Sequence, residues 1–132
     1  MQACKLTITT AVDGQETTLA RAGQIEISDG KATLTYQEET AQVSISLQKG
    51  EAVVERQGDY ALTLFLQQGK TLEGKIGLGE SSGVVAVKTY HVKYSIERNL
   101  FRLALRYDLL FGEGIQKMQL RIRAQIKDRE GK

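Results

Sequence analysis

Glycine marks most of the short gaps between the apolar segments of this chain, and each gap implies one pairing of the segments beside it. Apolar and polar residues alternate with a period of two almost throughout, which is typical of half-buried β-strands. A two-residue loop at Asp29-Gly30 pairs Ile27 with Ala32, and one at Lys49-Gly50 also sets apolar residues opposite each other. A shift of one residue would set apolar against polar side chains, so the pattern predicts consecutive antiparallel hairpins.

Two later turns extend this series of hairpins. A three-residue loop centred on Gly58 is expected to pair Arg56 with Tyr60 across the turn. A two-residue loop at Gly112-Glu113 defines a register for the last two strands, and that register again sets apolar residues opposite apolar residues. Both loops keep the inward-facing set of side chains in phase with the set predicted by the earlier turns.

Three segments depart from the simple alternation. The first strand is expected over residues 5–12, and residues 14–22 are predicted to be a longer connection that contains a helical turn. The long strand over residues 84–97 changes phase in its middle, because its apolar residues move from odd to even positions. A β-bulge within residues 88–91 would explain that change, since a bulge inserts one extra residue into a strand.

The predicted fold is therefore all-β, an antiparallel up-and-down meander of about eight to ten strands. Closing such a sheet into a small barrel buries its apolar face and removes its exposed edges. The chain has 132 residues and no proline, which suits a single domain over residues 1–132 whose backbone N–H groups are mostly paired. The tail, residues 127–132, is expected to be frayed.

Composition and charge narrow the class of protein. Hydrophobic residues make up 41% of the chain and charged residues 26%, which is typical of a globular protein. No window is long and apolar enough for a transmembrane helix, and the N-terminus has no signal-peptide pattern. Cys4 is the single cysteine, so we expect a cytoplasmic protein without disulfides. The net charge is only +2, but residues 98–132 carry 9 basic and 4 acidic side chains.

Three local signatures carry a resemblance to a known family. They are the run Tyr36-Gln37-Glu38, the run 54–58 (Val-Glu-Arg-Gln-Gly) and the run 103–109 that contains Tyr107. With the strand spacing, the whole chain resembles the YwiB-like family of small bacterial proteins of unknown function. The resemblance implies a calycin-like, or lipocalin-like, β-barrel and implies no activity. The chain differs from the family at residues 77–83, where a Thr/Tyr-Gly element is replaced by a glycine- and serine-rich run.

One group of polar residues lies in phase with the apolar set and is predicted to point into the barrel. Its members are Tyr36, Glu38, Arg56 and Tyr60. A buried arginine needs a partner, and Glu38 is the nearest inward-facing carboxylate. The first interpretation is a salt bridge that closes one barrel end and fixes the register. The second is a site where the arginine and tyrosines bind the carboxylate or phosphate of a small anionic or amphipathic ligand.

A second group of basic residues lies on the opposite, outer face of the last two strands. Its members are Arg102, Arg106, Arg121 and Arg123. The register sets Arg102 across from Arg123, which is unfavourable unless other groups compensate, and sets Asp108 across from Lys117 as an ion pair. A solvated face with carboxylates from a neighbouring strand is favoured over a surface for RNA or an acidic protein. No aromatic residue is expected among these arginines, although single-strand-binding platforms require one.

The remaining polar residues suggest no catalytic site. His91 is the only histidine, its spacing from Cys4 fits no metal site, and Ser81-Ser82 is typical of an ordinary turn. We therefore predict a non-enzymatic protein without metal or cofactor. The favoured function is a small-ligand-binding barrel module with the inward cluster as its site, and the alternative is a packed-barrel interaction protein with an outer basic face. Homodimerisation through an apolar patch at Leu110 and Ile115 is also predicted.

Overall fold

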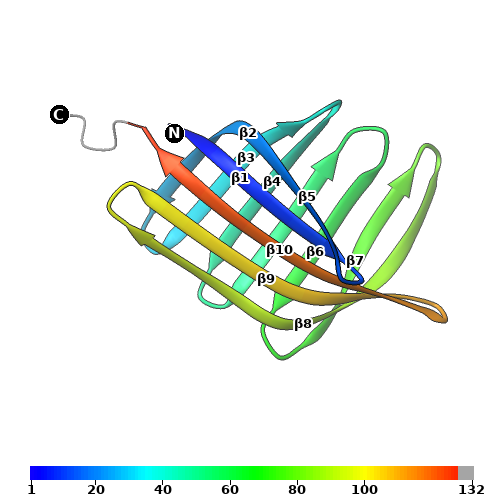
Figure 1. The fold of residues 1–132 in the computed structure, drawn as a ribbon. Helices are drawn as coiled ribbons and strands as arrows, with labels where there is room; N and C mark the ends of the chain where they lie inside the picture. Colours follow the sequence, from blue (N-terminus) through cyan, green and yellow to red (C-terminus); the bar gives the residue numbers. More distant parts are fainter. Residues whose placement is uncertain (128–132) are drawn as a thin grey trace.

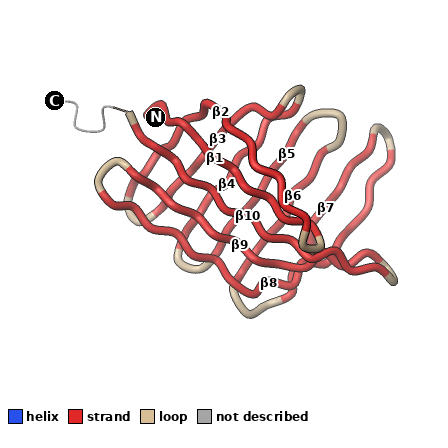
Figure 2. The backbone as a smooth tube through the Cα atoms, viewed as in Figure 1, coloured by secondary structure: helices blue, strands red, loops and turns tan. Residues whose placement is uncertain are grey.

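The strands of the chain pair in the order of the sequence, and the first strand then pairs with the last. The computed structural model describes residues 1–127, which form ten strands. Short turns join them (Figures 1 and 2). The strands are β1 (Gln2–Val12), β2 (Gln15–Ser28), β3 (Lys31–Glu38), β4 (Ala41–Gln48), β5 (Glu51–Gln57), β6 (Ala61–Gln67), β7 (Thr71–Leu78), β8 (Ser81–Glu97), β9 (Leu100–Phe111) and β10 (Gly114–Ile126). Pairing of β1 with both β2 and β10 closes the barrel, so the predicted up-and-down meander and its closure are confirmed.

The two-residue hairpin turns adopt the backbone that their sequences predict. Asp29 and Gly30 have φ values of 50° and 79°, the left-handed conformation that a type I′ hairpin turn requires at both positions. Ile27 pairs with Ala32 as predicted, and the register of β9 with β10 is also the predicted one. The registers at these turns therefore follow from the turn residues and from the apolar pattern together.

The β5–β6 turn is longer than predicted. Arg56 pairs with Leu62 rather than with Tyr60, so the hairpin loop contains two more residues than expected. The reason is that the Arg56 side chain holds the turn itself: it donates hydrogen bonds to the carboxylate of Asp59 and to the backbone oxygen of Tyr60. Because the error is an even number of residues, the inward-facing set of side chains does not change.

Residues 14–22 do not form the predicted connection with a helical turn. They form the turn into β2 and the first half of that strand, which pairs with β1 along its length, as in the pair Thr9 with Thr18. This half of β2 extends beyond β3, whose pairing with β2 begins only at Gly23. With a partner on one side only, its inward residues remain partly exposed and need not be strongly apolar, so the alternation is weak. The first strand also begins earlier than predicted, at Gln2.

Strand β8 contains the predicted bulge. The pairing of β8 with β9 shifts between Thr89 and His91, so Tyr90 has no partner on β9. The extra residue changes the phase of the strand, which is why apolar residues lie at odd positions before the bulge and at even positions after it. Tyr90 donates a hydrogen bond from its hydroxyl to Asp108 on β9, at 2.8 Å.

The barrel interior is filled by aliphatic and aromatic side chains. Leu34, Ile45 and Val87 have no exposed area, and Phe101 and Ile122 are 1% exposed. Side chains around a water-filled space would keep accessible area, so the barrel is packed around these residues. Of the predicted frayed tail, residues 128–132 lie outside the described residues, while the Lys127 backbone N–H donates to the Ala3 oxygen. No helix within residues 1–127 could span a membrane.

Candidate functional site

The inward cluster lies at one end of the barrel, which we call the barrel mouth, beside the β3–β4 and β5–β6 turns. Arg56 is its centre. The guanidinium lies 3.5 Å from the Glu38 carboxylate, 2.9 Å from the Asp59 carboxylate and 2.9 Å from the Tyr60 backbone oxygen. It also lies over the Tyr60 ring, 3.8 Å from the ring centre. The predicted salt bridge between Arg56 and Glu38 is therefore present, and Asp59 adds a second carboxylate that the sequence analysis missed.

These contacts leave Arg56 well supplied with protein partners. Its side chain is 15% exposed, while those of Glu38 and Asp59 are 36% and 69% exposed. The hydrogen bond from Arg56 lowers the pKa of the Asp59 carboxyl below its usual value. A guanidinium that already binds two carboxylates and a backbone oxygen has less capacity to recruit an outside anion, so this geometry fits the closure of the barrel end.

Tyr36, the fourth predicted member, lies deeper in the barrel. It is 7% exposed, and Tyr107 on β9 is 5% exposed. Burial is the largest influence on both hydroxyls: it raises the pKa of Tyr107 to about 12, and burial and then Glu38 raise the pKa of Tyr36. Within residues 1–127 the fully buried side-chain oxygen that lacks a hydrogen-bond partner is Thr89 Oγ1, so neither tyrosine hydroxyl is both fully buried and unpaired.

Arg21 also faces the barrel interior, and the sequence analysis missed it. It pairs with the buried Leu6 on β1 and is half-buried. Its guanidinium donates to the Ala20 backbone oxygen, and its positive charge opposes the rise in the pKa of Tyr36. Correct assignment of residues 14–22 as a strand in phase with Leu19 would have revealed it.

The four predicted outer arginines lie on one exposed face, formed by β8, β9 and β10. These strands lie side by side in the front wall of Figure 1. Arg102 lies across from Arg123, and Ala104 lies between Lys93 on β8 and Arg121 on β10. The predicted register is therefore confirmed.

A hollow of about 390 Å³ lies on this face, above the small side chain of Ala104. We call it the basic groove, and the charged side chains that line it are Lys93, Arg102, Arg121 and Arg123. No carboxylate of residues 1–127 is among its lining groups. Arg121 donates to Glu16 on β2 at 2.9 Å, but both side chains are more than half exposed, so solvent and salt weaken that pair. The groove therefore combines four positive charges with a shallow floor.

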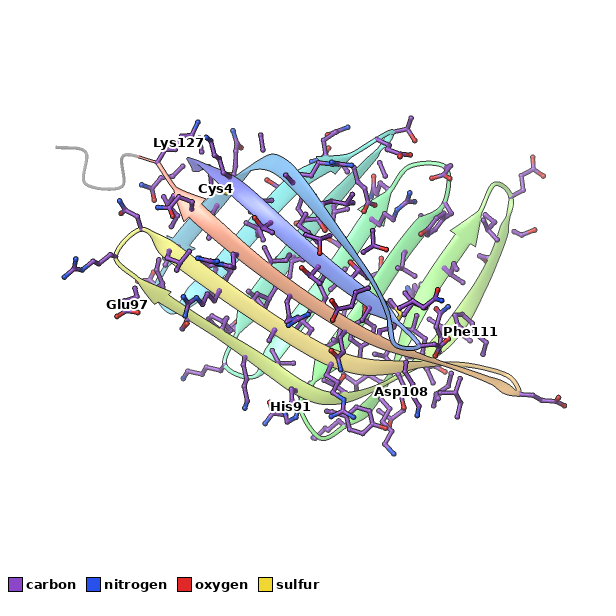
Figure 3. The ribbon with its side chains drawn as sticks, in the orientation of Figure 1. Cys4, His91, Glu97, Asp108, Phe111 and Lys127 are labelled. Atoms are coloured by element: carbon purple, nitrogen blue, oxygen red, sulfur yellow. The ribbon has the colours of Figure 1, made fainter. Side chains whose placement is uncertain are left out.

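A second hollow, of about 490 Å³, lies further along the same face. We call it the Tyr90 hollow; its charged and aromatic lining residues are Glu16, Tyr90, Arg106, Asp108 and Lys117. Tyr90, at the bulge of β8, lines this hollow, so the prediction that no aromatic residue lies among the arginines is wrong. The predicted ion pair of Asp108 with Lys117 is also wrong: the two residues are opposite each other, but Asp108 accepts the hydrogen bond of Tyr90 instead. Figure 3 shows His91 and Asp108 on this side of the barrel.

The remaining predicted residues have structural surroundings of their own. Cys4 is 2% exposed in the core, and burial raises the pKa of its thiol. Leu110 and Ile115 are paired, and Ile115 is 61% exposed. Homodimerisation through this pair remains a prediction.

A family model matches the sequence of the chain. The family model described as "Domain of unknown function (DUF1934)" matches residues 3–122, which is most of the chain. The chain belongs to the DUF1934 family.

The fold of this DUF1934 chain is similar to a solved structure, the crystal structure of the ywiB protein from Bacillus subtilis. The TM-score is 0.80 with 15% sequence identity, and the match covers 95% of this chain and 92% of the other. The expected resemblance to a YwiB-like family of unknown function is thereby confirmed, together with a small all-β barrel. No curated protein matches the chain in sequence.

The DUF1934 family description names no activity, ligand or partner. At 15% identity the structural match establishes the fold alone. The side chains of this DUF1934 chain that bear on its function are those of the barrel mouth, the basic groove and the Tyr90 hollow.

Proposed function

We propose that this chain is a non-enzymatic, cytoplasmic protein that binds an anionic partner through the basic groove. The observation that carries the proposal is the hollow above Ala104, which four positive side chains line without a carboxylate from residues 1–127. Positive charge gathered in a concave surface attracts anions and raises their local concentration. Three of the four charges are arginines, whose planar guanidinium groups match phosphate or carboxylate oxygens in pairs.

The direct opposition of Arg102 and Arg123 supports this proposal. Like charges directly across two strands are destabilising, and these two side chains form no ion pair with any of residues 1–127. An anion between them would remove their repulsion. The strands that form the groove are hydrogen-bonded to their neighbours, so their backbone is already ordered before binding. Binding would therefore lose little affinity to the entropy cost of ordering the backbone.

Charge reversal tests the proposal. We expect the double variant Arg121→Glu with Arg123→Glu to lose binding to oligouridine and to poly-L-glutamate, measured by fluorescence anisotropy. On a single-stranded nucleic acid the slope of log affinity against log salt should fall by about 0.7 for each phosphate that the variant no longer neutralises. The matched control is Lys31→Glu with Lys75→Glu, which makes the same change in net charge on exposed residues of β3 and β7. An equal decrease in affinity for both variants would show that net charge alone acts, and would contradict a specific groove.

A second candidate function is the binding of a small anionic or amphipathic ligand at the barrel mouth. It is supported by Tyr36, a buried residue of the cluster whose hydroxyl interacts electrostatically with Glu38, Tyr107 and Arg21. Native mass spectrometry of gently purified protein tests it. Extra mass that disappears on denaturation would support a ligand, and the Tyr36→Phe/Tyr107→Phe variant should then lose that mass. A bare mass that stays bare after incubation with fatty acids and nucleotides would count against this second candidate.

A further inference from the structure

The Tyr90 ring lies on the same outer face as the basic groove, at the bulge in β8. In a regular strand every residue would lie opposite a residue of β9. Here the register shifts between Thr89 and His91, which leaves Tyr90 unpaired, and Tyr90 lines the hollow beside Arg106. Bulges re-aim side chains and often occur beside functional sites. The structure therefore adds to the arginine face the aromatic group that single-strand binding requires.

A hydrogen bond holds the hydroxyl end of the Tyr90 side chain, while the faces of its ring have only loose contacts. The hydroxyl donates to Asp108 at 2.8 Å, which limits the orientation of the side chain. The Arg106 guanidinium and the Lys88 ammonium lie 5.2 Å and 5.5 Å from the ring centre. These distances are longer than the 3.8 Å of Arg56 on Tyr60, so neither cation is packed tightly on the Tyr90 ring. An incoming planar group could stack on the ring and displace only an exposed side chain.

The Tyr90 hollow and the basic groove are neighbours along the strand direction. Arg106 lines the hollow and Ala104, two residues earlier on β9, forms the floor of the groove. Two residues of a strand span about 6.6 Å. Along β9 and β10 the outward-facing arginines therefore recur at that interval: first Arg106, then Arg121, then the pair of Arg102 and Arg123. A polymer with a regularly spaced negative charge fits such a stripe better than a single small anion.

The two hollows differ in charge, and the difference discriminates between partners. The basic groove has no lining carboxylate within residues 1–127, whereas the Tyr90 hollow contains Glu16 and Asp108 beside Arg106 and Lys117. An acidic peptide would meet repulsion at those two carboxylates. A nucleobase is neutral, carries hydrogen-bond donors and acceptors, and has a flat face that stacks on tyrosine.

We propose that the partner is a single-stranded nucleic acid, with phosphates in the basic groove and a base stacked on Tyr90. This inference rests on the proposed function and specifies its partner. Phosphate contacts would supply the salt-dependent part of the affinity, and stacking would supply a part that salt affects little.

The test compares three probes on the full chain by fluorescence anisotropy: labelled oligouridine, a duplex RNA of equal length, and poly-L-glutamate. We expect oligouridine to bind most tightly. Tyr90→Ala should weaken its binding about 5- to 100-fold without changing the salt slope, because the substitution removes stacking and leaves the phosphate contacts in place. Tyr90→Phe keeps the ring and should bind like the wild type, which also shows that the missing Asp108 hydrogen bond is not the cause. Thermal unfolding of each variant confirms that it is folded.

Several outcomes would overturn this inference. Equal binding of oligouridine by the wild type and Tyr90→Ala would remove the stacking role. Tighter binding of poly-L-glutamate or duplex RNA, abolished by charge reversal at Arg121 and Arg123, would leave the proposed function standing and overturn the single-stranded partner. Absence of binding to all three probes at low salt would overturn both.

Discussion

Arg102 on β9 lies directly across from Arg123 on β10, with both side chains exposed and no carboxylate of residues 1–127 lining the hollow that they share. The two guanidinium groups repel each other in the unbound protein. A sheet that keeps this pair loses some stability, and the proposed binding of an anion is the compensating gain. Stability and binding should therefore respond in opposite directions to substitution here.

Arg102→Glu tests that opposition. The new carboxylate would pair with Arg123, so we expect the free energy of unfolding to rise by about 0.2–1 kcal/mol, the range for cross-strand pairs. The same substitution should weaken oligouridine binding. Urea unfolding and anisotropy measure the two effects on one protein. A variant that is less stable, or that binds as well as the wild type, would contradict the role given to this pair.

Arg56→Leu tests the barrel mouth. The substitution removes three polar contacts and the stacking on Tyr60. We expect a decrease of about 1–3 kcal/mol in the free energy of unfolding, discounted for the partial exposure of its partners. Arg56→Lys should lose less of the free energy of unfolding than Arg56→Leu but should remain less stable than the wild type, because an ammonium cannot reproduce the planar set of donors of a guanidinium. Chemical denaturation gives both values, and a fully stable Arg56→Leu protein would argue against closure of the barrel end by this residue.

Tyr107 predicts how stability changes at alkaline pH. Burial raises its pKa from 10.0 to about 12 in the folded protein. The unfolded chain therefore releases the proton first, so the stabilising contribution is complete below pH 10.0 and is lost as pH rises to about 12. Tyr107→Phe should flatten the fall in stability across that window relative to wild type. Denaturation series in this pH range would refute the assignment if the two proteins lost stability in parallel.

Gly23 is predicted to be required for close packing of β2 on β3. A Cβ atom at this position would lie 2.6 Å from the Thr35 backbone oxygen and 2.9 Å from Leu6 Cδ1. Gly23→Ala should therefore destabilise the protein by about 1–3 kcal/mol. Gly83→Ala is the control, because its Cβ would meet only Ile76 Cγ2 at 3.8 Å, and it should change stability by less than about 0.5 kcal/mol. Equal thermal midpoints for the two variants would show that the close approach at Gly23 relaxes at no cost.

Much of the barrel could be predicted because its turns and its apolar pattern carry the same information. The turn at Asp29-Gly30 and the register of β9 with β10 both follow from residues that are close in sequence. The first half of β2 could not be predicted, since a strand paired on one side needs no strict alternation. The length of the β5–β6 loop depends on hydrogen bonds from the Arg56 side chain to Asp59 and Tyr60. The pattern of apolar residues carries no information about these bonds.

The candidate site was predicted in part for a similar reason. The outward direction of the four arginines follows from the period of two. The aromatic group among them does not, because a bulge is visible in sequence only as a change of phase, and the change could be placed only within residues 88–91. The hollow above Ala104 was missed although its signal was available: a small residue lies at the centre of long basic side chains on three paired strands.

The most direct test of the central claim is a titration of ¹⁵N-labelled protein with oligouridine, followed by amide chemical shifts. We predict that the shifted amides cluster on β8, β9 and β10, at residues 88–95, 102–108 and 117–123, and that those of the β3–β4 and β5–β6 turns remain unchanged. Shifts confined to the barrel mouth, or no shifts at low salt, would contradict an anion-binding function for the outer basic face.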